Sequence, residues 1–267
     1  MNRIVTYEQC IDVINHFKAN ASHLKTNFYM LPDELKKVIS SRVIYYQMSC
    51  DLLILYIEES DYLRVYYWTT DRTFPVINVF GKVMILDLVA RNRENKEEQR
   101  WEKAGFEPYK LYTRMKYDLT DFRGKSESAQ YDVFPASATD IKGVVGLWKR
   151  CLDCYSTSFP TMDEMERLVK SQHIYCIRQE QDLLGAVYMD VASKSCVLKH
   201  LAIDSFYRRQ GLGSALMNYA LKKMMEEGMQ KCVLWVDIEN IPAYENYVKY
   251  GFMQDGLWSR QMIRRRN

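Results

Sequence analysis

The chain has 267 residues, of which 48% are hydrophobic and 27% charged, and its formal net charge is +3. This composition excludes a disordered chain, the charge is too small to indicate a nucleic-acid partner, and no apolar run approaches the roughly 18 residues of a membrane span. Seven cysteines without regular spacing favour reduced thiols, so we expect a cytoplasmic protein with neither a membrane nor a nucleic acid as a partner.

The first half of the chain combines apolar strands with a short helix. Residues 51–60, 62–71 and 82–91 are rich in β-branched and aromatic residues and predict three strands, and 94–105 predict a helix. The connection at 72–81 contains a proline and is too short for a long helix with a glycine-rich start.

The polar, small-residue-rich stretch 121–130 is typical of a linker. We therefore predict two domains, residues 1–127 and residues 128–267.

The second half predicts a strand and two helices, then an antiparallel meander, then a strand–helix–strand crossover. A long helix with apolar residues at helical spacing ends near Gly228, and a short helix ends before Gly251. The expected strands cover 131–137, 173–180, 183–193, 195–204 and 231–238, with a last pair of strands in 256–265, and the expected helices cover 139–151, 162–172, 212–227 and 241–250. This order indicates an α/β fold of the α+β type, with a mixed, largely antiparallel twisted sheet flanked by helices.

Two segments repeat. Residues 105–114 read GFEPYKLYTR and residues 251–260 read GFMQDGLWSR, and Trp101 and Tyr247 each lie four residues before their glycine. Repetition at about half the chain length indicates two related tandem domains. Trp101 has no acidic hydroxyl, and we expect it in the core.

The segment YRRQGLGSAL (207–216) sets two arginines beside a glycine-framed helix start. Unpaired N–H groups and the helix dipole favour an anion there, and glycine allows a close approach of the backbone. Gly211 and Gly213 could alternatively form only a tight turn. The P-loop pattern fails because no lysine follows Gly213, and the dinucleotide pattern fails because position 216 is leucine.

This segment resembles the acyl-CoA motif of the GNAT N-acetyltransferase superfamily, R/Q-x-x-G-x-G/A, at Arg208, Gly211 and Gly213. The downstream pattern Asn240-x-x-Ala243-x-x-x-Tyr247-x-x-x-Gly-Phe resembles that family's second signature. The resemblance covers about residues 131–262 well, and the first half only through the repeat. It implies a GNAT-like fold, with a degenerate N-terminal domain that lacks the CoA-binding motif.

The resemblance implies acetyl-CoA as the acyl donor and no metal. Backbone groups of Leu201 and Ile203, on a strand that bulges, would bind the pantetheine arm and the acetyl carbonyl. The N–H groups of residues 209–214 would bind the pyrophosphate, with Arg208 nearby. The implied donor-binding residues are Leu201, Ala202, Ile203, Arg208, Arg209, Gln210, Gly211, Leu212, Gly213, Ser214, Asn240, Ala243 and Tyr247.

The resemblance implies that Tyr247 is the general acid that protonates the leaving thiolate. Tyr247 could alternatively be only a core aromatic residue, and Asn240 only a helix N-cap. Many relatives place a glutamate base at the position of Val197. The remaining candidates for the base are Asp190, His200 and Asp237, or a water chain to a distant carboxylate.

These patterns predict an acetyl-CoA-dependent N-acetyltransferase. The acetyl group would pass to a primary amine by direct attack in a ternary complex. The acceptor would be a small-molecule or peptide amine, and the chain a monomer or dimer with one active site. The alternative is a non-catalytic acyl-CoA-binding sensor or interaction module, which the missing glutamate at Val197 motivates.

Overall fold

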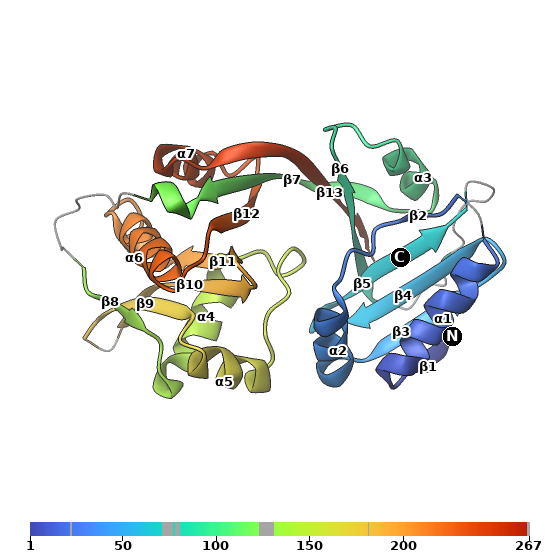
Figure 1. Ribbon diagram of the computed structural model, residues 1–267, viewed down its shortest axis with the longest axis horizontal. Helices are drawn as coiled ribbons and strands as arrows, with labels where there is room; N and C mark the ends of the chain where they lie inside the picture. Colours follow the sequence, from blue (N-terminus) through green and yellow to red (C-terminus); the bar gives the residue numbers. More distant parts are fainter. Residues whose placement is uncertain (22, 71–76, 78–80, 123–130, 181, 266–267) are drawn as a thin grey trace. The chain divides into compact units, whose positions relative to one another are not determined.

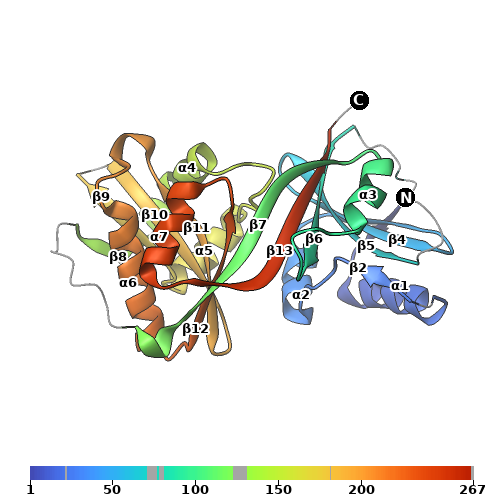
Figure 2. The same cartoon turned by 90° about the horizontal axis from the view of Figure 1, so that it is seen from above.

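The computed structural model describes residues 1–21, 23–70, 77, 81–122, 131–180 and 182–265. The chain divides into two compact units, of which unit 1 comprises Met1–Tyr112 and Leu257–Asn267 and unit 2 comprises Thr113–Gly256. Figures 1 and 2 show the helices and strands of both. The predicted boundary between residues 127 and 128 lies outside the described residues, as does most of the predicted linker.

Unit 2 is a mixed sheet with helices on both faces (Figure 1). Strands β8 to β11 pair antiparallel in chain order, and β12 pairs parallel with β11. The elements of unit 2 are β8 (Val133–Pro135), α4 (Ile141–Cys151), α5 (Met162–Lys170), β9 (Ile174–Gln179), β10 (Asp182–Ala192), β11 (Ser195–Ile203), α6 (Leu212–Glu226), β12 (Lys231–Asp237) and α7 (Ile241–Tyr250), with short 3-10 turns at Leu119–Asp121, Ala138–Asp140 and Ser205–Tyr207. The predicted fold class is confirmed in this unit.

Alternating residues of β10 separate the two cores of unit 2. Val187 and Met189 pack in the core beneath α6, whereas Ala186 and Tyr188 pack in the core beneath α4 and α5. Alternation places successive side chains on opposite faces, so α6 and the α4–α5 pair cover opposite faces of the sheet.

Local sequence explains where the helices of unit 2 begin and end. Thr161 and Glu164 form a capping box at the start of α5, in which the Thr161 N–H donates to the Glu164 carboxylate at 2.7 Å. Helix α7 begins at Asn240, whose side chain accepts a hydrogen bond from the Ala243 N–H at 3.3 Å. The same helix ends at Gly251, which has φ +97°.

The strands of unit 1 follow the order β1-β3-β4-β5-β6, with β13 beside β6, and they pair both antiparallel and parallel. Helices α1 and α2 cover one core, and α3 supplies the central Trp101 of the other. The elements are β1 (Asn2–Ile4), α1 (Tyr7–Ala19), β2 (Lys25–Thr26), α2 (Pro32–Ser41), β3 (Ile44–Met48), β4 (Leu52–Glu58), β5 (Tyr62–Thr69), β6 (Val83–Ala90), α3 (Glu97–Lys103), β7 (Glu107–Asp118) and β13 (Met253–Arg264), the last two contributing residues to both units. Trp101 is fully buried, as expected.

The two units repeat one arrangement of parallel strands. In unit 1, β5 and β6 pair in parallel only up to Arg64 and Ile85, and in unit 2, β11 and β12 pair only up to Val197 and Val233. In each unit the paired stretch begins at the first residue of the earlier strand. Arg64 in unit 1 therefore occupies the position that Val197 has in unit 2. The predicted connection at 72–81 lies outside the described residues, except for residues 77 and 81.

The C-terminal strand belongs to the sheet of unit 1. Residues 258–264 of β13 pair with residues 84–90 of β6. The predicted pair of strands in 256–265 is wrong, because β13 is one strand in which Gly256 adopts φ +82°. Its residues from Leu257 onward group with unit 1, whereas the predicted second domain extended to residue 267.

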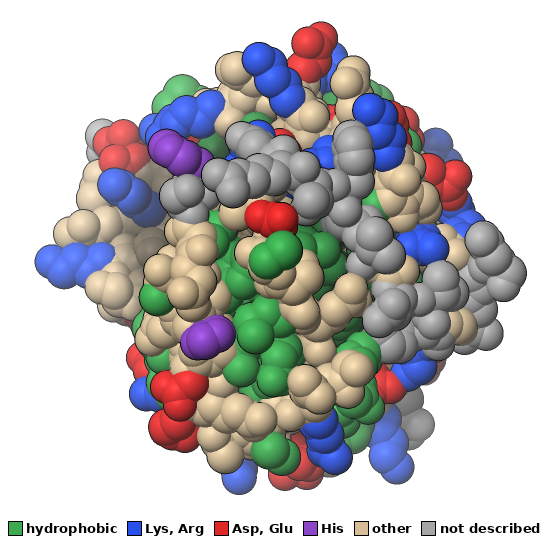
Figure 3. Space-filling view, turned by 90° about the vertical axis from the view of Figure 1, so that its right-hand side faces the viewer, with side chains coloured by type: hydrophobic (Ala, Val, Ile, Leu, Met, Phe, Trp, Pro, Cys, Tyr) green, Lys and Arg blue, Asp and Glu red, His purple; other side chains and the backbone are tan. Residues whose placement is uncertain are grey.

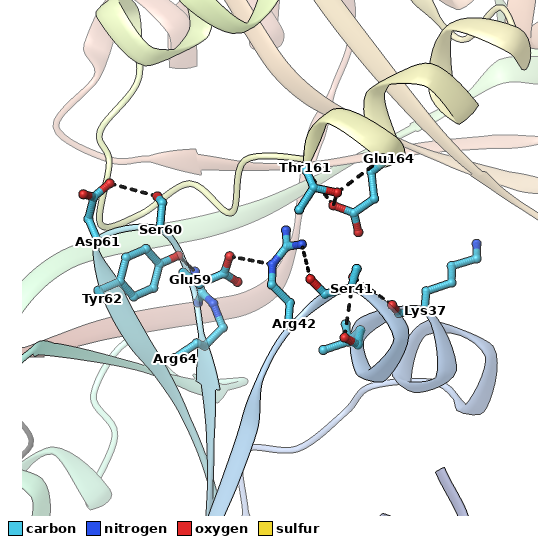
Figure 4. Close-up of polar contacts among 11 residues, drawn as sticks. Lys37, Ser41, Arg42, Glu59, Ser60, Asp61, Tyr62, Arg64, Thr161 and Glu164 are labelled. Carbon is cyan, nitrogen blue, oxygen red and sulfur yellow. Dashed lines mark hydrogen bonds and ion pairs between the residues drawn. The ribbon is translucent and has the colours of Figure 1, made fainter. Parts of the chain in front are cut away.

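Partly buried charged side chains pair on the sheet of unit 1. The Arg64 guanidinium binds Asp87 at 2.5 Å and the Tyr62 hydroxyl at 2.8 Å, and the Gln261 amide donates to Asp87 at 3.1 Å. Nearby, Arg42 forms an ion pair with Glu59 at 3.3 Å (Figure 4). These pairs satisfy charges that would otherwise be costly to bury.

One face of unit 1 is shown in Figure 3. Hydrophobic side chains gather near the centre of this view, and Lys and Arg side chains lie scattered among Asp and Glu. The described charged side chains of this face are thus of mixed sign.

Candidate active site

The parallel strands β11 and β12 pair only at their beginnings. The pairing ends at Val197 and Val233, although β11 continues to Ile203 and β12 to Asp237. Past that point the two facing edges do not pair with each other. Strand-edge N–H and C=O groups of this kind can bind an extended ligand arm.

Strand β11 carries a bulge beside this separation. Between its paired residues Lys199 and Ala202 it has two residues, His200 and Leu201, where β10 has one. His200 has φ +52°, a left-handed conformation that is uncommon for residues other than glycine. The bulge that the family resemblance implied is therefore present, next to the residues whose backbone we expect to bind the donor.

Helix α6 begins at the glycine-framed segment. Gly211 is its N-cap with φ +89°, and Arg209 also has a positive φ, +61°. The N–H of Ala215 donates to the Gly211 carbonyl at 3.0 Å, so the first turn closes there and the N–H groups before Ala215 have no acceptor within α6. Apart from its own chain neighbours, no described atom lies within 4 Å of the position that a Gly211 Cβ would take. These features fit a bound pyrophosphate.

Side chains hold the loop that precedes α6. The Arg208 Nε donates to the carbonyl of Ile203 at 3.2 Å, and the Cys151 thiol donates to the same carbonyl at 3.5 Å. The Gln210 amide donates to the Phe206 carbonyl at 3.5 Å, while Tyr131 donates to the Gln210 carbonyl at 3.1 Å. Hydrogen bonds thus hold the loop to the end of β11, to its own 3-10 turn and to Tyr131.

Several predicted donor-binding residues have side chains in the core. Ala202 and Leu212 are buried, and Leu201 and Ala243 pack against the core beneath α6. The side chains of Leu201, Ala202 and Leu212 are apolar, so only their backbone groups could bind a ligand through hydrogen bonds.

Gly185 was not predicted as a site residue, yet it supports the predicted site. A Cβ at this position would lie 2.5 Å from Ile203 Cδ1 and 3.0 Å from Leu216 Cδ1. A Cβ here would therefore force the terminal methyl groups of Ile203 and Leu216 to shift. The sequence signal, one glycine inside an apolar strand, is too common to identify such a role by itself.

Helix α7 packs against the start of α6 through polar contacts. The Tyr250 hydroxyl donates to the Ser214 carbonyl at 2.7 Å, and the Ser214 hydroxyl donates to Asn246 at 3.4 Å. Asn240, the predicted ligand of the pantetheine arm, is the N-cap of this helix. Its carbonyl accepts from the Tyr244 N–H at 3.0 Å.

Tyr247 lies in the core beneath α6 and is 8% exposed. Its ring packs edge-on against Phe252, with the ring centroids 5.8 Å apart. Burial raises the pKa of the Tyr247 phenol well above its usual value, and the neighbouring Cys232 raises it further. The phenol is therefore protonated at neutral pH, and burial makes it a weaker acid than an exposed phenol.

Asp190, the first candidate base, is part of a small polar cluster on β10 and β11. Its carboxylate binds the Lys199 ammonium at 2.6 Å, and both side chains are about 40% exposed. The carboxylate also shares a hydrogen bond with the Tyr188 hydroxyl, and burial is the main cause that raises the pKa of that phenol. Lys199 was not among the predicted site residues.

His200, the second candidate, lies among aromatic rings. Its ring centroid is 5.0 Å from that of Trp148, 6.0 Å from that of Tyr188 and 6.2 Å from that of Phe159. Burial lowers the His200 pKa to about 4, and the charge of Lys199 contributes in the same direction. The imidazole is therefore neutral at neutral pH.

Asp237, the third candidate, ends β12. Its side chain accepts a hydrogen bond from the Glu239 N–H at 3.1 Å, and its carbonyl accepts from the Asn240 N–H at 3.0 Å. This carboxylate therefore helps to fold the turn that leads into α7. Each of the three candidates thus makes structural contacts.

The described residues contain no group of three or more His, Cys, Asp or Glu side chains that could hold a metal ion. None of the helices they form is long and apolar enough to cross a membrane.

Residues 144–252 match the model of the Acetyltransferase (GNAT) family, and these residues hold the bulge, the start of α6 and helix α7. The chain is 41% identical to a mycothiol acetyltransferase of Corynebacterium aurimucosum over 46 residues. This stretch covers 17% of this chain and 15% of that protein. The chain is also 40% identical to N-alpha-acetyltransferase 30 of Xenopus laevis over 55 residues. This stretch covers 21% of this chain and 20% of that protein. The chain therefore spans at most a fifth of these curated relatives.

The fold is shared with solved structures over most of the chain. A GCN5-related N-acetyltransferase from Sphaerobacter thermophilus superposes with a TM-score of 0.62 at 10% identity and covers 88% of this chain and 85% of its own. At this identity the match shows the fold alone.

Proposed function

Because residues 144–252 form a domain of the GNAT acetyltransferase family, we propose that the chain is an acetyl-CoA-dependent N-acetyltransferase. The acetyl group passes directly from the thioester to a primary amine while both substrates are bound. The observation that carries this proposal is one arrangement: β11 bulges and separates from β12 where the glycine-framed α6 begins.

The proposed donor site follows the backbone of this arrangement. The N–H groups of residues 209–214 bind the pyrophosphate, and the exposed Arg208 adds positive charge beside it. Backbone groups of Leu201 and Ile203 bind the pantetheine arm and the acetyl carbonyl. Asn240 contacts the same arm at the start of α7.

The proposed reaction forms a C–N bond and breaks the C–S bond of the thioester. The amine nitrogen attacks the carbonyl carbon, and a backbone N–H at the bulge stabilises the oxyanion that develops. The thiolate that leaves takes a proton from the Tyr247 hydroxyl, and the amine loses one proton to a base. The tyrosinate regains its proton from solvent.

The base is one of Asp190, His200 and Asp237, or a water chain to a more distant carboxylate. The Asp190 carboxylate is already engaged in an ion pair with the Lys199 ammonium at 2.6 Å. A neutral imidazole can accept a proton, but burial among aromatic rings opposes its charged form. The activity of Asp190→Asn, His200→Gln and Asp237→Asn variants against pH separates these possibilities.

The proposed acceptor is a small-molecule or peptide amine. The two curated relatives differ here, since one name denotes acetylation of mycothiol and the other acetylation of α-amino groups. We further propose that unit 2 provides the single active site, that unit 1 is a degenerate copy of it, and that the chain acts in the cytoplasm as a monomer or dimer.

The test is release of CoA thiol from acetyl-CoA in the presence of a panel of primary amines. The panel spans amino acids, polyamines, aminoglycosides, and peptides with free N-termini or lysines. Release above the hydrolysis rate with at least one amine supports an enzyme. Acetyl-CoA binding without release across the whole panel supports the alternative, a non-catalytic acyl-CoA sensor, for which Val197 in place of a glutamate is the motivating observation.

A further inference from the structure

A cavity of about 300 Å³ lies between the C-terminal half of α6 and the segment that enters β9. Tyr219 and Lys223 line it from α6, and Gln172 and Tyr175 line it from the segment around the start of β9, which packs against α6 (Figure 1). At a rise of 1.5 Å per residue, the last turn of α6 lies about 20 Å from the first. The cavity is therefore separate from the start of α6, where we propose that pyrophosphate binds.

Tyr175 brings to this cavity a polar group that the described protein does not use. The residue is 1% exposed, and its ring packs edge-on against that of Tyr219, with the ring centroids 5.2 Å apart. Its hydroxyl has no hydrogen-bond partner among the described residues. Burial is the main cause that raises the Tyr175 pKa, and the charge of Glu227 is the next, so the hydroxyl lies toward that carboxylate. Buried polar groups without a partner are rare, and this one lines a cavity that could supply a partner.

The charged groups of the cavity favour a cation. Glu226 and Glu227 line it at the C-terminal end of α6, where the helix dipole is negative. Lys223 and Lys222 pair with Glu226 at 2.8 and 4.0 Å. One oxygen of Glu227, Oε2, lies 3.0 Å from the His173 ring, whereas Oε1 has no partner among the described residues. Glu227 is therefore the carboxylate that remains available to a ligand.

Lys223 shows that an alkyl ammonium group fits beside the tyrosine rings. Its nitrogen lies 5.8 Å from the centroid of the Tyr219 ring, within the range of a cation–π interaction. The cavity volume is at the lower end for ligand pockets, so it suits a small molecule. A ligand ammonium can donate to Glu227 Oε1 and to the Tyr175 hydroxyl while its alkyl chain contacts the rings.

We propose that this cavity binds a small organic ammonium ion, with Glu227 and the Tyr175 hydroxyl as its hydrogen-bond partners. The inference goes beyond the proposed acetyl transfer and does not rest on it. The site lies at the opposite end of α6 from the proposed donor site, and its occupant exchanges no group with acetyl-CoA.

The first test uses two probes of equal length, pentylammonium and the neutral pentan-1-ol. Both are titrated into the full chain, and the backbone amide signals are followed by NMR. We expect pentylammonium to shift the signals of residues 172–175 and 223–228 with a Kd of about 1–10 mM, and pentan-1-ol to bind at least about tenfold more weakly. Equal affinity of the two probes would overturn a cation site, and unchanged signals in these two segments would overturn the position.

Two substitutions test the proposed contacts. Glu227→Gln keeps the shape and removes the charge, and Tyr175→Phe removes only the hydroxyl and keeps the ring packing against Tyr219. We expect the Kd of pentylammonium at these signals to rise at least about tenfold for the first and about threefold for the second. Tyr175→Phe removes no described hydrogen bond, so its folding should be preserved.

The matched control is Glu245→Gln, which neutralises an exposed carboxylate on α7 that does not line the cavity. Its Kd should stay within about twofold of the wild-type value. An unchanged Kd in both cavity variants would overturn the proposal. If pentylammonium also binds elsewhere as an acetyl acceptor, that event shifts other signals and persists in these variants, so failure of the proposed function and failure of this inference are distinguishable.

A third substitution should act in the opposite direction. Lys223→Met removes the ammonium that pairs with Glu226 and keeps a long unbranched side chain beside Tyr219. Because a competing positive charge is lost, we expect the Kd of pentylammonium to fall at least about threefold. An unchanged or weaker affinity would contradict a site that attracts cations and would overturn the proposal.

Discussion

The Tyr250 hydroxyl donates a 2.7 Å hydrogen bond to the backbone carbonyl of Ser214. Ser214 lies in the first turn of α6, and Tyr250 is the last residue of α7. The bond therefore joins the helix that we propose to bind pyrophosphate to the helix that carries the proposed general acid. Their relative placement depends in part on this contact.

We expect Tyr250→Phe to weaken both stability and donor binding. Removal of the hydroxyl leaves the Ser214 carbonyl without this partner, which should lower the free energy of unfolding by about 1 kcal/mol. The acetyl-CoA Kd should rise a few-fold because the start of α6 is less well held. Tyr244→Phe on the same helix is the control, since its hydroxyl makes no hydrogen bond within the part of the chain that the structure describes. Equal effects of the two substitutions would contradict this reading.

Tyr247→Phe tests the proposed proton transfer. The substitution keeps the ring packing against Phe252 and removes only the proton that we propose is given to the thiolate. We expect kcat to fall about 100-fold, and the acetyl-CoA Kd to stay within about twofold. Steady-state kinetics and calorimetry measure the two. If kcat stays unchanged, Tyr247 is a core aromatic residue and the thiolate is protonated by another group.

Gly185→Ala tests the close approach of β11 and α6 to β10. A Cβ at 2.5 Å from Ile203 Cδ1 forces side chains to shift, so we expect a loss of about 1–3 kcal/mol in the free energy of unfolding. Gly143→Ala in α4 is a matched control, because its Cβ would meet Leu183 at an ordinary 3.7 Å. That substitution should be neutral or stabilise the protein by up to about 1 kcal/mol. Denaturant unfolding of both variants measures the contrast.

The His200 pKa predicts how stability changes with pH. The ordinary pKa is 6.5, and the folded protein holds it at about 4. Between these values the unfolded chain binds a proton that the folded protein does not, so the His200 contribution lowers stability as the pH falls from 6.5 to 4 and is absent above that range.

At pH 5 this loss amounts to about 2 kcal/mol relative to pH 7.5. We expect wild-type protein to lose about that much more than His200→Gln over this interval, measured by denaturant unfolding at both pH values. The nearby Lys199 and Asp190 remain in both proteins and cancel in the comparison. If the free energy of unfolding has the same pH dependence in wild type and variant, the folded protein does not lower the His200 pKa, and this prediction is wrong.

The features that the sequence predicted correctly are those in which a residue type is required by its own backbone conformation. Gly211 and Gly251 have φ of +89° and +97°, and Asn240 is a helix N-cap, so each residue type is constrained by its own conformation. Such constraints depend on a few neighbouring residues and leave a readable pattern. The order of strands and helices in unit 2 was predictable for the same reason.

The features that the sequence did not reveal depend on contacts between distant segments. The space at Gly185 is limited by the side chains of Ile203 and Leu216, and the Lys199–Asp190 ion pair depends on how the bulge sets the register between two strands. The pair of strands predicted in residues 256–265 is part of the single strand β13, which contains Gly256. This strand pairs with β6, a segment far away in the sequence, so the local pattern does not reveal the pairing.

The central claim, that the start of α6 binds the pyrophosphate of acetyl-CoA, is tested by Gly211→Asp against Gly211→Asn. The two side chains have the same shape and both tolerate a positive φ, and no described atom lies within 4 Å of the Cβ position, so only the added negative charge differs. By isothermal titration calorimetry we predict a Kd for acetyl-CoA near the wild-type value for Gly211→Asn, and at least about 30-fold weaker for Gly211→Asp. Equal affinities in the two variants, or no acetyl-CoA binding by the wild-type protein, would contradict the account.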